Sequence, residues 1–347
     1  MSPRLMLNAA LLLVLVAAIY LAVQLAQGRP AISSRWLNPP TLAPVAAVHA
    51  LVGKSSPLIS QARAVPSHER LDTFNRASTL QERVADGQLE LYRRPLAGGG
   101  KLAYVVARLG AQVQIELINA DGATPGSDEA GNTIWLDRQQ HLATVAEMVG
   151  APYAARAGRE LLAAMAFGFH GDVRTSDEGS VVINGIVYRV NAGRAALCIT
   201  PAQQAQIGRF DAEGLKGCQQ AVGGGPVILW HGKIADPALT AATDEAVPFN
   251  PLGEDFAQLD WRIKIYHNTY PKTAVCVGDL PGGSFLVLVT SNGVVGVELA
   301  RALRAMGCTS ALGGDDDTST QATWRGQSLW PNQPRAVPDA IGVYLSH

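Results

Sequence analysis

The chain has 347 residues, of which 48% are hydrophobic and 16% are charged, and its formal net charge is −1. Its length suffices for one large domain or two ordinary ones, and its apolar fraction suffices for a core that needs no metal ion. Lys and Arg are scattered singly among acidic residues, so no basic stripe follows the chain as nucleic-acid binding would require. The composition therefore predicts a folded protein and excludes disorder and nucleic-acid partners.

The chain begins with a hydrophobic segment. Arg4 precedes an apolar run over residues 5–25 that contains only three polar residues. A positive charge followed by an apolar stretch is typical of an export signal, and about 20 apolar residues also suffice for a membrane-spanning helix. Residues 1–28 are predicted to be a signal anchor, or a signal peptide if they are cleaved. The protein is then expected in the cell envelope, anchored through residues 5–25 and facing the periplasm or exterior, or secreted.

A linker and one large domain are predicted to follow. Residues 29–67 are rich in Pro, Ala and Ser and have no sustained periodicity, which is typical of a linker. Residues 68–347 are predicted to form the folded domain, which begins with a helix-compatible stretch over 68–86. It contains four cysteines, which an oxidising compartment would join in one or two disulfides with three possible pairings, although free buried cysteines fit the sequence equally well: Cys198, Cys218, Cys276 and Cys308.

Several segments of the domain have strand patterns. Polar and apolar residues alternate over 112–117, as in a strand with one solvent-exposed face. Asn184 and Gly185 lie between two β-branched runs and predict a hairpin, because both central residues of a type I′ turn need positive φ. Buried strands are predicted over 226–230, 273–277 and 284–289, and the last is continuously apolar and expected to be central in its sheet.

Helical patterns are fewer. Asp137 can cap a helix that runs to Met148, and a second helical pattern follows over 161–165. Apolar residues with helical spacing over 295–306, followed by Gly307, predict a third helix. The predicted fold class is α+β: a single large domain with a mixed β-sheet and flanking helices, preceded by an N-terminal hydrophobic helix.

Three segments, in this order, resemble the phosphodiester glycosidase family. Residues 221–228, with Gly223, Gly224 and Gly225 before Pro226, are similar to its Gly-Gly-Pro-Val strand. Residues 270–275 are similar to its Pro-Arg-Thr-Ala strand. The third segment, residues 298–340, is similar to its helix, its Asp-Gly-Gly-Gly-Ser-Ser loop and its closing strand. A weaker match lies at 164–170. The order of the matches carries the resemblance, because one Gly-rich fragment alone is weak evidence.

The resemblance implies a hydrolase that cleaves a sugar from a sugar-1-phosphodiester, with a phosphorylated carbohydrate from exopolysaccharide or cell-wall glycan metabolism as substrate. A phosphate monoester leaves readily as an anion, but a carboxylate is still needed as nucleophile or base. Asp315 matches the family's Asp and is the first candidate, with Glu298 as a second carboxylate. The residues implied in substrate or phosphate binding are Gly223, Gly224, Gly225, Lys272, Thr273, Ser319 and Arg335.

The sequence departs from the family pattern at four positions. Lys272 replaces an Arg and loses its two-pronged fork, Ala166 replaces an Asn, and Asp316 and Asp317 replace two glycines and add negative charge. These changes keep a second function open, a non-catalytic envelope protein that binds a glycan or phospho-polymer through a degenerate site. A third is a phosphodiesterase with a divalent cation on Asp315, Asp316 and Asp317; otherwise no cofactor or metal is expected.

Overall fold

The computed structural model describes most of the chain beyond the N-terminal segment. The chain divides into two units, residues 1–61 and 62–347. The predicted hydrophobic helix and most of the linker lie outside the described residues, so the domain boundaries stay predictions. Within the described residues, no helix is long and apolar enough to cross a membrane. These residues are 65–120, 126–127, 133–134, 142–169, 179–256, 259–331 and 334–347.

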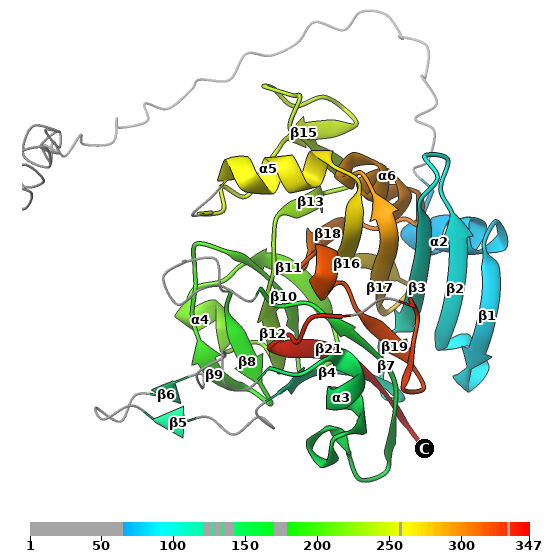
Figure 1. Ribbon diagram of the computed structural model, residues 1–347, viewed down its shortest axis with the longest axis vertical. Coiled ribbons are helices and arrows are strands. Elements are labelled where there is room, and N and C mark those ends of the chain that lie inside the picture. The colour runs from blue at the N-terminus through cyan, green and yellow to red at the C-terminus, as the bar shows by residue number, and fades with distance from the viewer. Residues whose placement is uncertain are drawn as a thin grey trace, which may run out of the picture. The chain divides into compact units, whose positions relative to one another are not determined.

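The described residues form mostly β-sheet with few helices (Figure 1). The largest sheet has nine strands and contains one parallel pair, β14 with β15, among antiparallel neighbours, so the predicted mixed sheet is confirmed. Its strands, in spatial order, are β1 (Thr79–Val84), β2 (Leu89–Pro95), β3 (Lys101–Arg108), β17 (Gly283–Val294), β16 (Tyr270–Leu280), β18 (Ser310–Gly313), β13 (Val227–Trp230), β14 (Lys233–Asp236) and β15 (Ala246–Pro248).

Two smaller antiparallel sheets complete the fold, where the sequence predicts only one sheet. The second sheet, in spatial order, comprises β11 (Ala205–Arg209), β10 (Ala195–Ile199), β12 (Gln220–Gly223), β8 (Val181–Ile183) and β9 (Ile186–Arg189). The third comprises β20 (Gln327–Ser328), β19 (Ala322–Trp324), β7 (Arg159–Ala166), β21 (Asp339–Ser346) and β4 (Val113–Asn119). A short pair is formed by β5 (Gly126–Ser127) and β6 (Thr133–Ile134).

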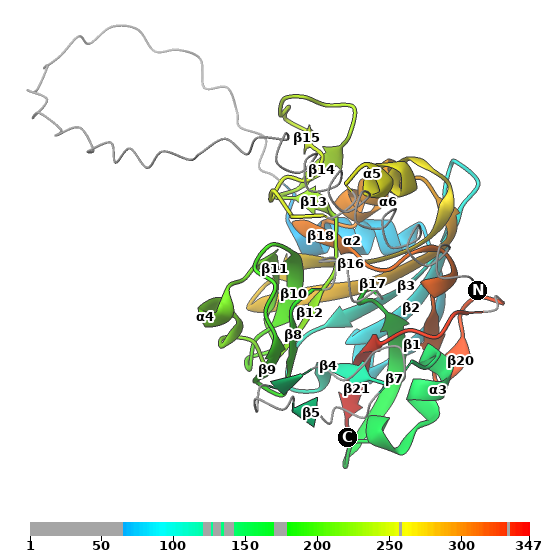
Figure 2. The same ribbon diagram turned by 60° about the vertical axis from the view of Figure 1, so that its left-hand side comes forward.

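The helices are short, and three of those described, α2, α5 and α6, cover one face of the large sheet. Figure 2 shows α2, α5 and α6 together on one side of this sheet and the two smaller sheets on the other. The described helices are α2 (Ser67–Arg76), α3 (Val145–Gly150), α4 (Ala212–Leu215), α5 (Leu259–His267) and α6 (Gly296–Ala305), with 3-10 turns η1 (Ala85–Gly87), η2 (Pro152–Ala154) and η3 (Asp317–Ser319).

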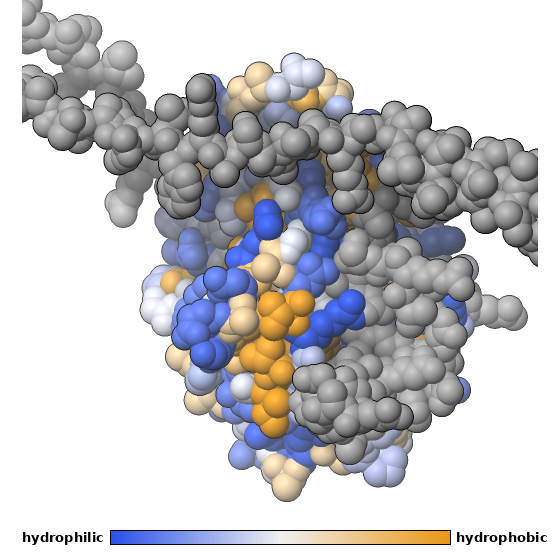
Figure 3. All heavy atoms as spheres, turned by 90° about the vertical axis from the view of Figure 1, so that its left-hand side faces the viewer, coloured by the Kyte–Doolittle hydropathy of each residue, from blue (hydrophilic) through white to orange (hydrophobic). Residues whose placement is uncertain are grey.

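The large sheet is buried on both faces. On β17, Leu286 and Leu288 enter a core shared by all three sheets, while Val287 and Val289 enter a second core beneath the helices. Alternate residues of a strand point to opposite faces, so two cores require a continuously apolar strand. The predicted central position of this strand is confirmed. At the surface, Figure 3 shows one face on which hydrophobic residues form a narrow strip bordered by hydrophilic residues.

Two elements predicted from short sequence patterns, a hairpin and a helix, are present in the structure. Asn184 and Gly185 have φ of 53° and 79° and join β8 to β9, which confirms the predicted hairpin. The predicted third helix is α6, and Gly307 follows it with φ of 88°. The stretch over 68–86 is only partly helical, because α2 ends at Arg76 and β1 follows.

The helix predicted over 161–165 is wrong: this segment is the central part of β7. The strand lies between β19 and β21, with Ala163 and Met165 in the core shared by the sheets and Ala164 in a third cluster on the opposite face. Burial on both faces removes the alternation that marks a strand, and Leu, Ala and Met favour helices by intrinsic propensity. Tertiary pairing overrides that propensity. The preceding helix, α3, is capped by Thr144; Asp137 lies outside the described residues.

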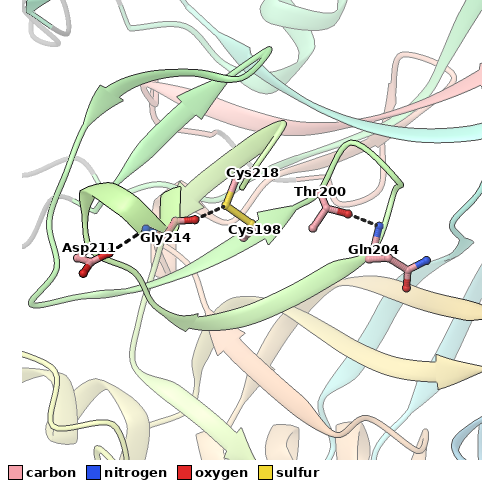
Figure 4. The surroundings of a disulfide bond; sticks show 6 residues. All are labelled: Cys198, Thr200, Gln204, Asp211, Gly214 and Cys218. Carbon is pink, nitrogen blue, oxygen red and sulfur yellow. Dashed lines mark hydrogen bonds between the residues drawn. A yellow bond between two sulfur atoms is a disulfide. The ribbon is translucent and has the colours of Figure 1, made fainter. Parts of the chain in front are cut away.

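Two disulfides are present among the described residues, and each joins a strand to the segment that leads into a neighbouring strand of the same sheet. Cys198 in β10 pairs with Cys218 just before β12, beside the turn capped by Asp211 (Figure 4). Cys276 in β16 pairs with Cys308 just before β18. Each bond closes a loop, of 20 and 32 residues respectively in sequence separation, and restricts the unfolded chain.

Replacing Cys276 and Cys308 together by alanine is expected to lower the free energy of unfolding by about 2–4 kcal/mol, because the unfolded chain regains the entropy that the crosslink removes. Urea denaturation of both proteins under non-reducing conditions measures the difference. Equal unfolding free energies, with thiol titration confirming an oxidised bond in the starting protein, would contradict this expectation.

Candidate active site

Three strand ends meet at one end of the nine-stranded sheet. β18 ends where β13 and β16 begin, as the pairings of Leu312 with Val227 and of Gly313 with Ala274 require. The three segments that carry the family resemblance therefore lie side by side, although up to 90 residues separate them. The glycine run, Lys272 and the loop that contains Asp315 therefore lie close together.

The glycine run makes a close passage between two sheets. It leads from the end of β12 to the start of β13, and Gly225 N donates to Gly313 O at 2.8 Å. A Cβ on Gly224 would lie 2.5 Å from Gly313 O, and Gly225 has φ of 133°. Only glycine permits this approach and this backbone conformation.

The backbone amides of the three glycines, which the sequence implies in substrate or phosphate binding, donate within the fold. Gly223 N donates to Ser180 O, Gly224 N donates to Ala195 O, and Gly225 N donates to Gly313 O, at 2.8–3.1 Å. Each amide thus has a backbone partner within the fold. The glycines shape the site by allowing close packing, and their N–H groups are not directed at a ligand.

A small pocket lies where this passage meets helices α5 and α6. Its charged lining consists of Arg262 from α5, Lys272 from β16 and Asp316 from the loop after β18. Gly225 and Thr273 also line it. The space left inside is about 20 Å³, room for about one water molecule.

Lys272 and Asp316 form a partly buried ion pair in this pocket. Lys272 Nζ donates to Ile265 O at 2.8 Å and lies 3.8 Å from Asp316 Oδ2. Asp316 Oδ1 accepts a hydrogen bond from Thr273 N at 3.0 Å, so Thr273 contributes its backbone. Burial lowers the pKa of Lys272, and the neighbouring carboxylates oppose this shift. Burial raises the pKa of Asp316 to about 6, against the attraction of Lys272.

Asp315 belongs to a second group beside the pocket. Its Oδ2 accepts a hydrogen bond from Arg335 Nη2 at 2.9 Å, and the same nitrogen donates to Ser319 Oγ at 2.5 Å. Burial raises the pKa of Asp315, while Ser319 and Arg335 oppose that shift. The predicted residues Asp315, Ser319 and Arg335 are therefore in contact, and Asp315 lies one residue from the pocket-lining Asp316.

Glu298 does not join these carboxylates. It lies on α6 between Gly296 and Leu299, both of which line the pocket, but its own side chain faces the turn between β2 and β3. A Cβ on Gly98 would lie 2.5 Å from Glu298 Oε2. Successive helical residues point about 100° apart, which accounts for the divergence. The prediction of Glu298 as a second catalytic carboxylate is not supported by its position.

Two other features singled out in the sequence, Ala166 and the aspartate run, have side chains that do not converge on a common site. Ala166 is fully buried in the cluster on the far face of β7, where its neighbours include Val337 and Ala340, so it acts as a core residue. Among the described residues, no group of three or more His, Cys, Asp or Glu side chains could hold a metal ion. Asp317 is exposed to solvent while Asp316 faces the pocket, so the three aspartates do not converge as ligands would.

Sequence reasoning missed a buried ion pair behind the glycine passage. Arg194 and Glu254 both have fully buried side chains, and their Nε and Oε1 atoms are 3.6 Å apart. Arg194 Nη2 donates to Gly224 O at 2.9 Å, and Glu254 accepts hydrogen bonds from the backbone N–H groups of Ala195 and Val227. Burial raises the pKa of Glu254, and Arg194 opposes this shift.

No sequence signal identified this pair or Arg262. Each is a single charge in a loop or short helix, without a motif around it. Isolated charges are normally solvated, and only the fold shows that these three lie behind or within the pocket.

Comparison with known proteins identifies the family of this chain. A sequence profile described as phosphodiester glycosidase matches residues 159–344, more than half of the chain. The matched region includes every pocket-lining residue described above. This chain belongs to the phosphodiester glycosidase family.

Solved structures share the fold at low sequence identity. A hypothetical protein from Synechocystis is 13% identical with a TM-score of 0.54, and the alignment covers 74% of this chain and 62% of that chain, less than two thirds of its length. The catalytic domain of zebrafish N-acetylglucosamine-1-phosphodiester alpha-N-acetylglucosaminidase, auto-inhibited by its pro-peptide, is 15% identical with a TM-score of 0.50, covering 78% of this chain and 86% of that chain. No curated protein sequence matches significantly.

Replacing Glu254 by glutamine is expected to destabilise the fold by about 3–5 kcal/mol, because Arg194 then keeps a buried charge without a counter-ion. Urea denaturation measures this loss. The double substitution Arg194→Met with Glu254→Gln serves as the control and should recover part of the stability. A single variant as stable as the unchanged protein would show that the pair does not hold the passage.

Proposed function

We propose that this chain is a hydrolase that cleaves a sugar from a sugar-1-phosphodiester. The observation that carries the proposal is the pocket in which Lys272 and Arg262 lie beside the aspartates of the loop after β18. Two cations suit a phosphodiester anion, and a carboxylate one residue away suits attack on the sugar. Family membership supports the same reaction class.

The reaction breaks the bond between the anomeric carbon and the phosphate oxygen. The phosphate monoester leaves as an anion, so Lys272 and Arg262 assist by stabilising negative charge. Asp315 acts as the nucleophile or as the base that activates water, and Arg335 and Ser319 hold its carboxylate in one orientation. Their hydrogen bonds also favour its ionised form, which both roles require.

A neighbouring cavity suits the sugar ring. It measures about 240 Å³ and is lined by Pro271, Ser291, Asn292, Thr320, Trp330 and Pro331. The backbone N–H of Lys272 donates to Ser291 Oγ at 3.0 Å, which connects this cavity to the charged pocket. Trp330 Nε1 donates to Thr290 Oγ1 at 2.9 Å and so fixes the indole. An aromatic face with uncharged polar groups around it is typical of neutral ligand sites.

An envelope location is part of the proposal. The apolar run over residues 5–25 supports export, and the two disulfides support an oxidising compartment. The substrate is then a phosphodiester-linked sugar of an exopolysaccharide or cell-wall glycan.

A non-catalytic binding protein is the second candidate. The observation that favours it is the ion pair between Lys272 and Asp316, which leaves only about 20 Å³ in the pocket. In that case the protein binds a phosphorylated glycan and releases no sugar.

The purified chain is expected to release N-acetylglucosamine from an N-acetylglucosamine 1-phosphodiester. Asp315→Asn should lower kcat by roughly 10²–10⁴-fold, because the amide cannot act as nucleophile or base. Asp317→Asn, an exposed position in the same loop, is the matched control and should keep the activity. Equal rates for Asp315→Asn and the unchanged protein would refute the role of Asp315, and no release by either would favour the binding protein.

Trp330→Ala is expected to raise KM by about tenfold with a smaller change in kcat, since the sugar loses an apolar contact worth about 1–2 kcal/mol. Steady-state kinetics on the same substrate measure both constants, and a thermal melt confirms folding. Trp261→Ala, which removes an exposed tryptophan from α5, is the control. An unchanged KM for the Trp330 variant would place the sugar elsewhere.

A further inference from the structure

Asp316 introduces a carboxylate at a position where the family pattern has glycine. Its two oxygens lie 3.0 Å from Thr273 N and 3.8 Å from Lys272 Nζ, inside the charged pocket. Glycine at this position would leave Lys272 and Arg262 in the pocket without that anion. The carboxylate therefore interacts with the cation that is best placed to bind a phosphate.

The size of the pocket makes the carboxylate and a phosphate mutually exclusive. With Asp316 in place, the pocket has room for about one water molecule. A phosphate group has four oxygens around phosphorus and does not fit beside the carboxylate. Binding of a phosphodiester at Lys272 thus requires that the Asp316 carboxylate gives up its contact with Lys272.

The charges of the pocket lead to the same conclusion. Lys272 from β16, Arg262 from α5 and ionised Asp316 give its lining a net charge of +1, which becomes +2 when Asp316 is protonated. Asp315, next in the chain, is already paired with Arg335, and Asp317 is exposed. Asp316 is therefore the carboxylate that decides how much positive charge the pocket offers.

We propose that the Asp316 carboxylate occupies the phosphate position in the free protein, and that a phosphodiester binds by displacing it from Lys272. The inference rests on the proposed function in one respect, since it assigns the substrate phosphate to this pocket. It makes Asp316 a specificity-determining residue that this chain has and the family pattern lacks.

The competition between the carboxylate and the phosphodiester depends on pH. Because burial raises the pKa of Asp316 to about 6, its carboxyl group is mostly neutral at pH 5 and mostly ionised at pH 8. The displaced carboxyl group stays beside the bound anion, and this like charge raises its pKa further. The phosphodiester therefore binds more tightly at low pH and takes up a proton on binding above about pH 6. If protonation is obligatory, affinity falls about tenfold per pH unit well above pH 6, and by about 50-fold from pH 6 to pH 8.

Calorimetric titration of the full-length chain with dimethyl phosphate between pH 5 and pH 8 tests this proposal. This probe carries one negative charge over the whole range, so its own ionisation does not contribute. The unchanged protein is expected to bind it more weakly as pH rises. Titrations in two buffers with different ionisation enthalpies should show the uptake of about one proton at pH 7.

Three variants isolate the role of Asp316. Asp316→Asn keeps the shape and removes the charge, and should bind at pH 8 about as tightly as the unchanged protein does at pH 5, with little pH dependence. Asp316→Gly also removes the bulk and should bind at least as tightly as Asp316→Asn. Asp317→Asn removes an exposed charge from the same loop and should keep the pH dependence of the unchanged protein. Thermal melts confirm that each variant is folded.

Two outcomes would overturn the proposal. One is an Asp316→Asn variant that keeps the original pH dependence or binds more weakly at pH 8, since Asp316 would then assist binding. The other is the absence of dimethyl phosphate binding to every variant, which would move the phosphate out of this pocket. The two proposals can also fail separately. If binding depends on pH, if Asp316→Asn removes that dependence, and if no sugar is released, the hydrolase proposal is refuted and the role of Asp316 is supported.

Discussion

The close backbone contact between the Gly224–Gly225 passage and Gly313 is the constraint on which the site depends. It brings the end of β12 against the ends of β18 and β13, at a distance that no side chain would permit. Arg194 and Glu254 hold the passage from behind through backbone hydrogen bonds. Once these strand ends meet, the loop after β18 must lie beside Lys272, and the charged pocket follows from that placement.

Charges around this contact are arranged as compensated pairs. Lys272 faces Asp316, Arg335 contacts Asp315, and Arg194 lies against Glu254. A buried charge is costly unless it is paired and hydrogen-bonded, so the free protein can hold these groups only because each has a partner. The same pairing has a functional consequence. A phosphodiester that enters the pocket replaces an internal anion, and the acidity of Asp316 then controls how readily that exchange occurs.

Prediction from sequence was accurate where the signal was local. The Asn184–Gly185 turn requires positive φ at two adjacent residues, and the period of α6 needs only ten residues to be recognised. It was wrong for β7, whose two buried faces hide the strand alternation. The sequence did not show that the amides of the glycine run donate to backbone carbonyls, because those partners lie in segments far along the chain. Glu298 lies in the predicted helix, but its side chain points from a face of α6 that is turned away from the pocket.

By itself the sequence determined the family and the chemical groups available to the site, since the ordered glycine, lysine and aspartate motifs can be read without coordinates. Tertiary structure alone decided which groups act together. It paired Asp316 with Lys272 and Asp315 with Arg335, and it recruited Arg262, Arg194 and Glu254 from segments without any motif. The physical reason is that side-chain direction at a strand end depends on register and on backbone contacts between segments far apart in the chain. Local residue patterns predict neither the register nor these contacts.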